Sequence, residues 1–267
     1  MKSDFLELEK IIKEKSESKP IYYIPNPGNW GDAIIRYATL KFFKDTNIKY
    51  EEIKNISLKI IIKAFFKGAT FIYGGGGAWC NCWNHSQHVV NKILDLKKIC
   101  KKINVIILPS TFENTYDLPE VTVFVRDKFE SKENMPQGIF CHDMSFYIDK
   151  MNVLPGDEIG YLFRTDKESS GSIIAPKENI DISSMGNELS DVNHLYKFLS
   201  KYSVIHTDRM HIAIAGCHLQ REVHLYQGGY FKNKAIYQSS LKDNFDNVFF
   251  HEEFCLKETV NPPFLMK

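Results

Sequence analysis

The chain has 267 residues, of which 34 are basic and 33 acidic, so its formal net charge is +1. A balance this even gives no long-range field that would attract nucleic acid, and any anion has to be bound by local groups. With 43% hydrophobic and 13% aromatic residues, the chain can form one large or two modest globular domains.

The cysteines and the N-terminus predict a cytoplasmic protein. Cysteines stand at positions 80, 82, 100, 141, 217 and 255, several of them in apolar stretches where a reduced thiol behaves as a small hydrophobe. The opening M-K-S-D-F-L-E-L-E-K lacks the basic start and apolar run of a secretory signal. No run of about 18 apolar residues occurs, so we expect no membrane-spanning segment.

Helices and strands are expected to alternate through the first half of the chain. Helical spacing of apolar residues predicts helices over 4–15, 33–43, 58–66 and 85–101, and a helix start at 127–131. Short apolar runs predict strands over 21–24, 70–73, 105–109, 121–126 and 139–143. Because a parallel crossover needs a helix to return the chain, this order indicates a parallel sheet covered on both faces.

The segment N-V-L-P-G-D at 152–157 interrupts the pattern, which then restarts. Strands are expected over 159–163, 204–207 and 222–226, and helices up to about residue 200, from Asp208 and over 232–242. A polar region at 166–190 lies between the first of these strands and the next helix. We therefore predict two α/β domains facing a cleft, one over 1–155 and a smaller one over 156–267.

Glycine-rich turns follow two of the predicted strands, where open α/β sheets bind ligands. In G-N-W-G-D at 28–32, Asn29 and Gly31 would let the backbone approach a ligand, and Asp32 is either a helix cap or a base. The alternative is a tight turn with a cap. The run Gly74 to Gly77 offers Gly75 and Gly76 for contact with phosphate or sugar, but it matches neither the Walker nor the dinucleotide spacing.

The stretch C-N-C-W-N-H-S-Q-H contains residue types that bind zinc. These are Cys80, Cys82, His85 and His88. A single residue between the two cysteines is tighter than the usual structural-zinc spacing, so we predict no metal site. We interpret the stretch as a loop that lines an acceptor cleft, with Trp79 and Trp83 available to stack on a sugar.

Two interpretations stay open for the lysine-studded helix over 58–66. It is either an interfacial basic helix, useful for a substrate carried on a lipid, or the ordinary covered helix of a βαβ unit. Arg126-Asp127 and His142-Asp143, after later strands, are second-rank candidates that equally fit caps and ion pairs.

The most specific stretch is T-D-R-M-H at 207–211, where Asp208 is expected to open a helix. A cation at a helix start is electrostatically unfavourable unless an anion binds there, so Arg209 is predicted to clamp a carboxylate or phosphate. His211 is predicted to donate a proton, with Asp208 favouring its charged form. In the structural alternative, Arg209 pairs with Asp208 or Asp191.

These motifs resemble the polysaccharide pyruvyltransferase family. D-R-M-H-I-A-I-A-G and the later H-L-Y-x-G-G-Y-F-K-N-K-A-I-Y-x-S-S-L carry the resemblance, and N-P-G-N-W-G-D-A, I-Y-G-G-G-G and V-R-D match the early motifs in order. The resemblance extends from about Ile21 to Leu241. It implies two Rossmann-like domains of the GT-B type, with the first on the acceptor side and the second on the donor side.

The resemblance also implies a reaction. An enolpyruvyl unit moves from phosphoenolpyruvate to two hydroxyls of a sugar, giving a cyclic pyruvate ketal and phosphate without a cofactor. Arg209 and Arg164 would clamp the donor, and His211 would protonate its methylene carbon. Asp32 or Asp143 would accept the hydroxyl protons.

The implied acceptor is a hexose or N-acetylhexosamine of a capsule, exopolysaccharide or wall polymer, carried on a polyprenyl lipid at the inner face of the membrane. Lys232 and Lys234 would reach its pyrophosphate or stay solvated. A lipid-borne acceptor fits peripheral membrane association.

Two other functions stay open. A GT-B glycosyltransferase that uses a nucleotide sugar also needs glycine loops and an arginine–histidine pair in a cleft. A non-catalytic carbohydrate-binding protein could keep the same fold.

Overall fold

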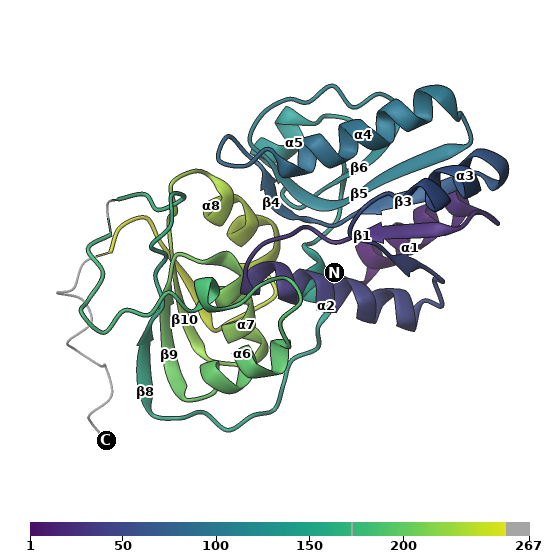
Figure 1. The fold of residues 1–267 in the computed structure, drawn as a ribbon. Helices are drawn as coiled ribbons and strands as arrows, with labels where there is room; N and C mark the ends of the chain where they lie inside the picture. Colours follow the sequence, from purple (N-terminus) through teal and green to yellow (C-terminus); the bar gives the residue numbers. More distant parts are fainter. Residues whose placement is uncertain (172, 255–267) are drawn as a thin grey trace, which may run out of the picture.

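The computed structural model describes residues 1–171 and 173–254, which form two all-parallel sheets flanked by helices (Figure 1). The first sheet has the order β2-β1-β3-β5-β6-β7, and β4 also pairs with β5. Its strands are β1 (Ile21–Ile24), β2 (Glu51–Glu52), β3 (Ala69–Tyr73), β4 (Gly76–Trp79), β5 (Ile103–Phe112), β6 (Val121–Val125) and β7 (Ile139–Phe140). The predicted parallel α/β class is confirmed.

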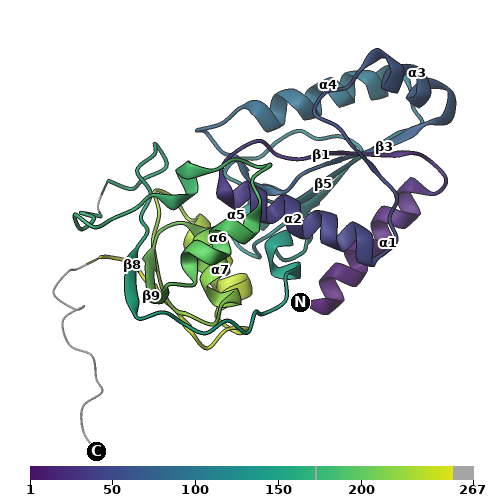
Figure 2. The same ribbon diagram turned by 60° about the horizontal axis from the view of Figure 1, so that its bottom comes forward.

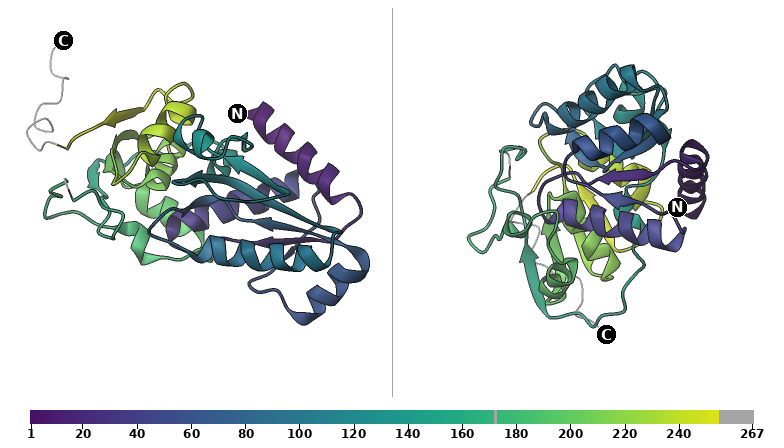
Figure 3. Two further views of the ribbon diagram at one scale, coloured as in Figure 1. Left: turned by 90° about the horizontal axis from the view of Figure 1, so that it is seen from above. Right: turned by 45° about the vertical axis from the view of Figure 1, so that its right-hand side comes forward.

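The second sheet is smaller and has the order β11-β10-β9-β8. Its strands are β8 (Glu158–Tyr161), β9 (Tyr202–Thr207), β10 (Glu222–Tyr226) and β11 (Val248–His251). Figure 3 shows the segments coloured green to yellow at one end of the molecule and those coloured purple to blue at the other.

Helices cover the first sheet on both faces. In Figure 2, α1 and α2 lie on one side of β1, β3 and β5, and α3 and α4 lie on the other. The helices are α1 (Lys2–Ser16), α2 (Trp30–Asp45), α3 (Leu58–Lys67), α4 (His85–Ile99), α5 (Glu130–Asn134), α6 (Val192–Leu199), α7 (Met210–His218) and α8 (Lys232–Ile236), with short helical turns η1 (Met144–Tyr147), η2 (Ile182–Met185) and η3 (Tyr237–Leu241).

Alternation along the strands explains the two-sided cover. Tyr23 and Ile72 belong to the apolar cluster on the α1/α2 side, whereas their neighbours Tyr22 and Phe71 belong to the cluster on the α3/α4 side. Successive side chains of a strand point to opposite faces, so a run with no polar positions needs helices on both.

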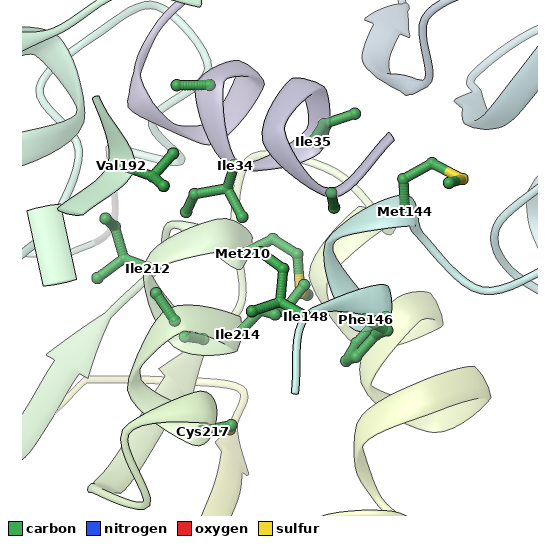
Figure 4. Close-up of a cluster of buried hydrophobic side chains, with 14 of the residues drawn as sticks. Ile34, Ile35, Met144, Phe146, Ile148, Val192, Met210, Ile212, Ile214 and Cys217 are labelled. Carbon is green, nitrogen blue, oxygen red and sulfur yellow. The ribbon is translucent and has the colours of Figure 1, made fainter. Parts of the chain in front are cut away.

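One apolar cluster joins the helices of the two sheets (Figure 4). Ile34 of α2 and Met144 of η1 come from the first half, and Met210 and Ile214 of α7 come from the second; all four are buried. Residue 155 lies between β7 and β8. The GT-B arrangement with domains over 1–155 and 156–267 stays a prediction.

Some local expectations need correction. The glycine run was expected to be a loop, but Gly76–Trp79 forms β4, paired with β5 at Gly76↔Ser110 and Trp79↔Phe112. Helix α7 begins at Met210, with Arg209 in the N-cap position, so Asp208 does not cap it. Glycines carry no hydrophobic pattern, which is why periodicity could not find this strand.

Two chain-wide observations concern cysteines and membrane spans. The five cysteines among the described residues are free thiols, and Cys255 lies outside those residues. In the part of the chain that the structure describes, each helix is too short or too polar to cross a bilayer.

Candidate active site

A cavity of about 320 Å³ lies where the carboxyl ends of the two sheets meet. Loops that follow strands of both sheets supply its lining, as expected for parallel sheets. The lining residues are Asn26, Pro27, Gly28, Asn29, Gly31, Asp32, Gly77, Ala78, Trp83, His85, Arg126, Arg164, Asp166, Glu168, Ser183, Ser184, Arg209, Met210, His211 and Lys232. Most of the predicted site residues therefore gather at one place.

The start of α2 is built by a capping box. The Asn29 side chain accepts from the Gly31 amide at 2.8 Å, and Asp32 accepts from the Asn29 amide at 3.0 Å. Asn26 donates to the other Asp32 oxygen at 2.8 Å and itself accepts from the Tyr73 hydroxyl. Asp32 is thus a fixed part of the helix start.

Asp32 also lines the cavity. Burial raises its pKa, and the hydrogen bond from Asn26 and the charge of His211 only partly offset this effect. A carboxyl group with a raised pKa accepts and returns a proton more readily near neutral pH. The two readings of Asp32, cap and base, are therefore compatible.

His211, in the first turn of α7, contacts residues of the first half of the chain. Its Nε2 lies 3.3 Å from Asp143 Oδ2 and 3.5 Å from Arg126 Nη1. On its other side, a Cβ at position 31 would lie 2.6 Å from His211 Nδ1, so only glycine fits there. Gly31 makes room for the imidazole ring.

Asp143 is the carboxylate that orients this group. It is fully buried, accepts from Arg126 Nη1 at 2.6 Å, and its second oxygen accepts from the amide and hydroxyl of Ser145 at 2.9 and 2.6 Å. Burial alone would raise the pKa of Asp143, but His211 and Arg126 hold it well below its usual range. Asp143 therefore stays ionised beneath the imidazole.

Asp208 was predicted to be the carboxylate beside His211, and the structure places it elsewhere. Its Oδ1 accepts from the Arg164 amide at 2.8 Å, and its backbone carbonyl accepts from Asn233 at 2.6 Å. Burial raises the pKa of Asp208 to about 6. Asp208 joins the end of β8 to the start of α7, and Asp143 takes the position expected for it.

Arg209 was predicted to clamp an anion, with an internal ion pair as the alternative, and in the structure it forms internal ion pairs. Its guanidinium donates to Asp181 at 2.5 and 2.6 Å and to Asp166 at 3.0 Å. These partners also differ from Asp208 and Asp191, the residues named in the structural alternative. The unfavourable position of a cation at the start of α7 is thus offset by acidic residues of the polar region after β8.

The other predicted cations are paired as well. Arg164 donates to Asp166 at 2.8 and 3.1 Å and to Glu168 at 2.8 Å, and Lys232 donates to Glu168 at 2.7 Å. Asp166 thereby bridges Arg164 and Arg209 at the cavity. Lys234, the second lysine of that stretch, instead pairs with Glu252 and is about half exposed.

Some of the predicted glycines and tryptophans line the cavity, and the others pack inside the protein. Gly75 lies against the Pro109 carbonyl and Gly76 against Ile35, whereas Gly77 lines the cavity. Trp79 is buried among aromatic residues and is not available to a sugar. Trp83 is 40% exposed and lines the cavity, with its Nε1 donating to Glu168 at 2.9 Å.

Around Cys80, Cys82, His85 and His88, the residues that the structure describes contain no group of three side chains able to hold a metal ion. Cys80 is buried, whereas His85 and His88 are exposed, so these side chains do not converge.

A sequence model of the polysaccharide pyruvyl transferase family matches residues 29–225. The chain belongs to the polysaccharide pyruvyl transferase family. The match begins at the cap of α2 and ends in β10, so it contains every lining residue named above except Asn26, Pro27, Gly28 and Lys232.

Among solved structures, the chain is similar to a functionally uncharacterized protein from Klebsiella pneumoniae. The two share 25% sequence identity with a TM-score of 0.75, and the match covers 94% of this chain and 100% of the other. A comparison with curated proteins found no match.

In this pyruvyl transferase family member, Arg126 lines the cavity, although the sequence ranked it only as a second-rank candidate. It follows β6 and is fully buried; Nε donates to Thr111 at 2.7 Å, and Nη1 donates to Asp143. Its Nη2 has no hydrogen-bond partner among the described residues and would lie 3.2 Å from a Cβ at Gly77. An arginine directly after a buried strand was the available signal, but it also fits an ordinary ion pair.

Proposed function

We propose that the protein transfers a pyruvyl unit from phosphoenolpyruvate to two hydroxyls of a sugar, forming a ketal, in the cavity between the sheets. The observation that carries this proposal is that Nη2 of the buried Arg126 has no hydrogen-bond partner among the described residues, while Nη1 of the same guanidinium lies 3.5 Å from His211 Nε2. A buried cationic donor without a partner is costly, and an anionic ligand would satisfy it.

Phosphoenolpyruvate carries a carboxylate and a phosphate, so it needs two cationic contacts. Arg126 provides the first, held in place by Thr111 and Asp143. Charge-assisted hydrogen bonds inside a buried site are stronger than those in water. The donor thus binds between Arg126 of the first half and His211 of the second.

Arg164 and Arg209 provide the second contact. Asp166 bridges both guanidinium groups, and its side chain is 32% exposed, so it is the carboxylate that a substrate anion displaces. Asp181 continues to hold Arg209 in position. Lys232 lines the same cavity and is held beside Arg164 by their shared partner Glu168.

The reaction has two steps, addition of the first hydroxyl and then loss of phosphate with ring closure. In the first step, a sugar hydroxyl oxygen bonds to C2 of phosphoenolpyruvate, His211 gives a proton to C3, and Asp32 takes the hydroxyl proton. In the second step, the C2–O bond to phosphate breaks and Asp32 returns its proton to the leaving phosphate. The second hydroxyl then closes the ring and gives its proton to His211, which restores both residues.

The acceptor lies toward Trp83, whose exposed indole at the cavity offers a flat apolar face to a sugar ring. A hexose or N-acetylhexosamine of a cell-surface polysaccharide precursor fits such a platform.

Release of phosphate from phosphoenolpyruvate, measured with a panel of sugar acceptors, tests the proposal. We expect acceptor-dependent release by the wild type and a loss of at least about 100-fold in His211→Ala with an unchanged melting temperature. Lys234→Ala, an exposed cation outside the cavity, is the matched control and should keep full activity.

The competing glycosyltransferase function is separated in the same assay. Uridine and cytidine diphosphate sugars are offered with and without Mg²⁺. Consumption of a nucleotide sugar without phosphate release from phosphoenolpyruvate would establish the alternative.

A further inference from the structure

Helix α3 presents an apolar face that the rest of the protein leaves uncovered. Ile60 and Ala64 are buried against the first sheet. Four other large apolar residues are exposed: Leu58 by 71%, Ile62 by 50%, Phe65 by 55% and Phe66 by 73%. Of the two interpretations left open by the sequence, the covered helix therefore accounts for only one side of α3.

The exposed residues share one face of the helix. Their spacing, with steps of four, seven and eight residues from Leu58, places them along a single stripe opposite Ile60 and Ala64. Helix α4 ends beside this helix, where the Cys100 thiol lies 3.3 Å from the Ala64 carbonyl. Ile99, at that end of α4, is 75% exposed.

A row of lysines flanks this stripe. Lys59, Lys63 and Lys67 recur every four residues along α3 and are exposed, and the stretch from Lys54 to Lys67 contains no acidic residue. The loop after α4 reaches the end of α3, where the Lys102 carbonyl would lie 3.0 Å from a Cβ at Gly68, and Lys101 and Lys102 of that loop are exposed.

An apolar stripe beside uncompensated lysines matches an anionic lipid surface. A second copy packed on the same face about a two-fold axis would bring the like-charged lysine rows together. The net charge of the whole chain is only +1, so this attraction is local. Helix α3 lies at the outer edge of the molecule, far from the second sheet (Figures 1 and 2).

We propose that α3 docks the protein on an anionic bilayer. Leu58, Ile62, Phe65 and Phe66 enter the boundary between headgroups and acyl chains, while Lys59, Lys63 and Lys67 contact the anionic headgroups. The docking rests on the α3 surface alone and does not depend on the proposed reaction, but it would keep the enzyme where a lipid-linked acceptor is found.

Co-sedimentation with vesicles tests the docking. One set of vesicles contains phosphatidylcholine alone, and the other contains phosphatidylcholine mixed with phosphatidylglycerol. We expect the wild type to bind the mixed vesicles and to dissociate at high salt. The combined Lys59→Gln, Lys63→Gln and Lys67→Gln variant should bind roughly 100-fold more weakly, at about fivefold per lysine.

Matched variants distinguish the effect of the α3 surface from the effects of net charge and of exposed apolar residues elsewhere. Lys10→Gln, Lys13→Gln and Lys15→Gln on α1 change the net charge equally and should leave binding unchanged. Phe65→Ser with Phe66→Ser should lose binding by at least about tenfold, whereas Leu6→Ser, also exposed, should not.

Three results would overturn the docking: equal binding to both vesicle types, no binding by the wild type, or wild-type binding by the Phe65/Phe66 variant. A wild-type dimer that the Phe65/Phe66 variant converts to a monomer, without vesicle binding, would assign the face to a second copy. Phosphate release with a water-soluble acceptor should be the same in all α3 variants, so failure of the docking is distinguishable from failure of the proposed function.

Discussion

Asp143 and His211 meet across the two halves of the protein: the carboxylate Oδ2 lies 3.3 Å from the imidazole Nε2, although 68 positions separate them in the chain. Asp143 is anchored by Ser145 and Arg126, so it fixes both the ring and the guanidinium that faces the cavity. A carboxylate in this position orients the imidazole ring of the histidine. We interpret Asp143 as a positioning residue.

A double-mutant cycle on this pair follows from that interpretation. Asp143→Asn and His211→Ala should each lower kcat/KM by about 100-fold or more, and the double variant should lose less than the product of the two single losses, because Asp143 acts partly through the ring and partly through Arg126. Additive losses, measured as phosphate release, would mean that Asp143 has an independent role.

Asp166 is expected to compete with the substrate for Arg164 and Arg209. Asp166→Ala should therefore lower the KM for phosphoenolpyruvate by about fivefold, since the two guanidinium groups are released for the donor. Asp149→Ala removes a highly exposed carboxylate on a different surface and serves as the control. A raised KM in Asp166→Ala would indicate that Asp166 supports the site.

The apolar cluster between α2 and α7 should make the two halves unfold together. Ile34 is fully buried there, so Ile34→Ala should lower the free energy of unfolding by about 3 kcal/mol. Ile62→Ala, the same change at a half-exposed position of α3, should cost less than about 0.5 kcal/mol. Urea unfolding that shows two transitions, with only one shifted by Ile34→Ala, would contradict a shared core.

Buried histidines should make the protein less stable in mild acid. Burial lowers the pKa of His142 and His218 to about 4 and that of His206 to about 3, from an ordinary value of 6.5. The unfolded chain binds these protons first, so stability is fully present above about pH 6.5 and falls as the pH drops toward 4. The pKa of Asp208 is raised to about 6, so this one carboxyl group makes the folded state more stable as the pH falls and offsets part of the loss from the histidines.

The measurement is urea unfolding at pH ~7 and pH ~5, where each of these histidines contributes about 1–2 kcal/mol to the loss. His206→Asn should reduce the difference between the two pH values, and His88→Asn, at an exposed position of α4, should not. A free energy of unfolding that is equal at both pH values would refute the effect.

Sequence patterns predicted most of the fold because buried parallel strands are short apolar runs. Strands such as Ile21–Ile24 and Glu222–Tyr226 are found where expected, and so are helices α1, α3 and α4 with small shifts at their ends. β4 was missed because its glycines carry no pattern, and β2 was missed because two residues are too few to recognise.

The sequence predicted where the candidate site lies but not which side chains pair with one another there. Loops after strands identified Asp32, Arg164, Arg209 and His211, because parallel sheets collect these loops at one edge. The partners of the arginines lie in the polar region over 166–190, where no periodicity fixes the path of the chain. Contacts such as Asp143–His211 depend on how α7 packs against the first half, which local sequence does not encode.

The central claim is that Arg126 Nη2, which has no hydrogen-bond partner among the described residues, binds phosphoenolpyruvate. Calorimetric titration of phosphoenolpyruvate into the wild type, Arg126→Lys and Arg36→Lys tests it most directly. Arg36 forms a two-point ion pair with Glu52 outside the cavity, so it is a matched control. We predict that the wild type and Arg36→Lys bind equally and that Arg126→Lys, assayed below its melting temperature, binds about 100-fold more weakly. Binding by Arg126→Lys equal to that of the wild type, or no binding by the wild type, would contradict the claim.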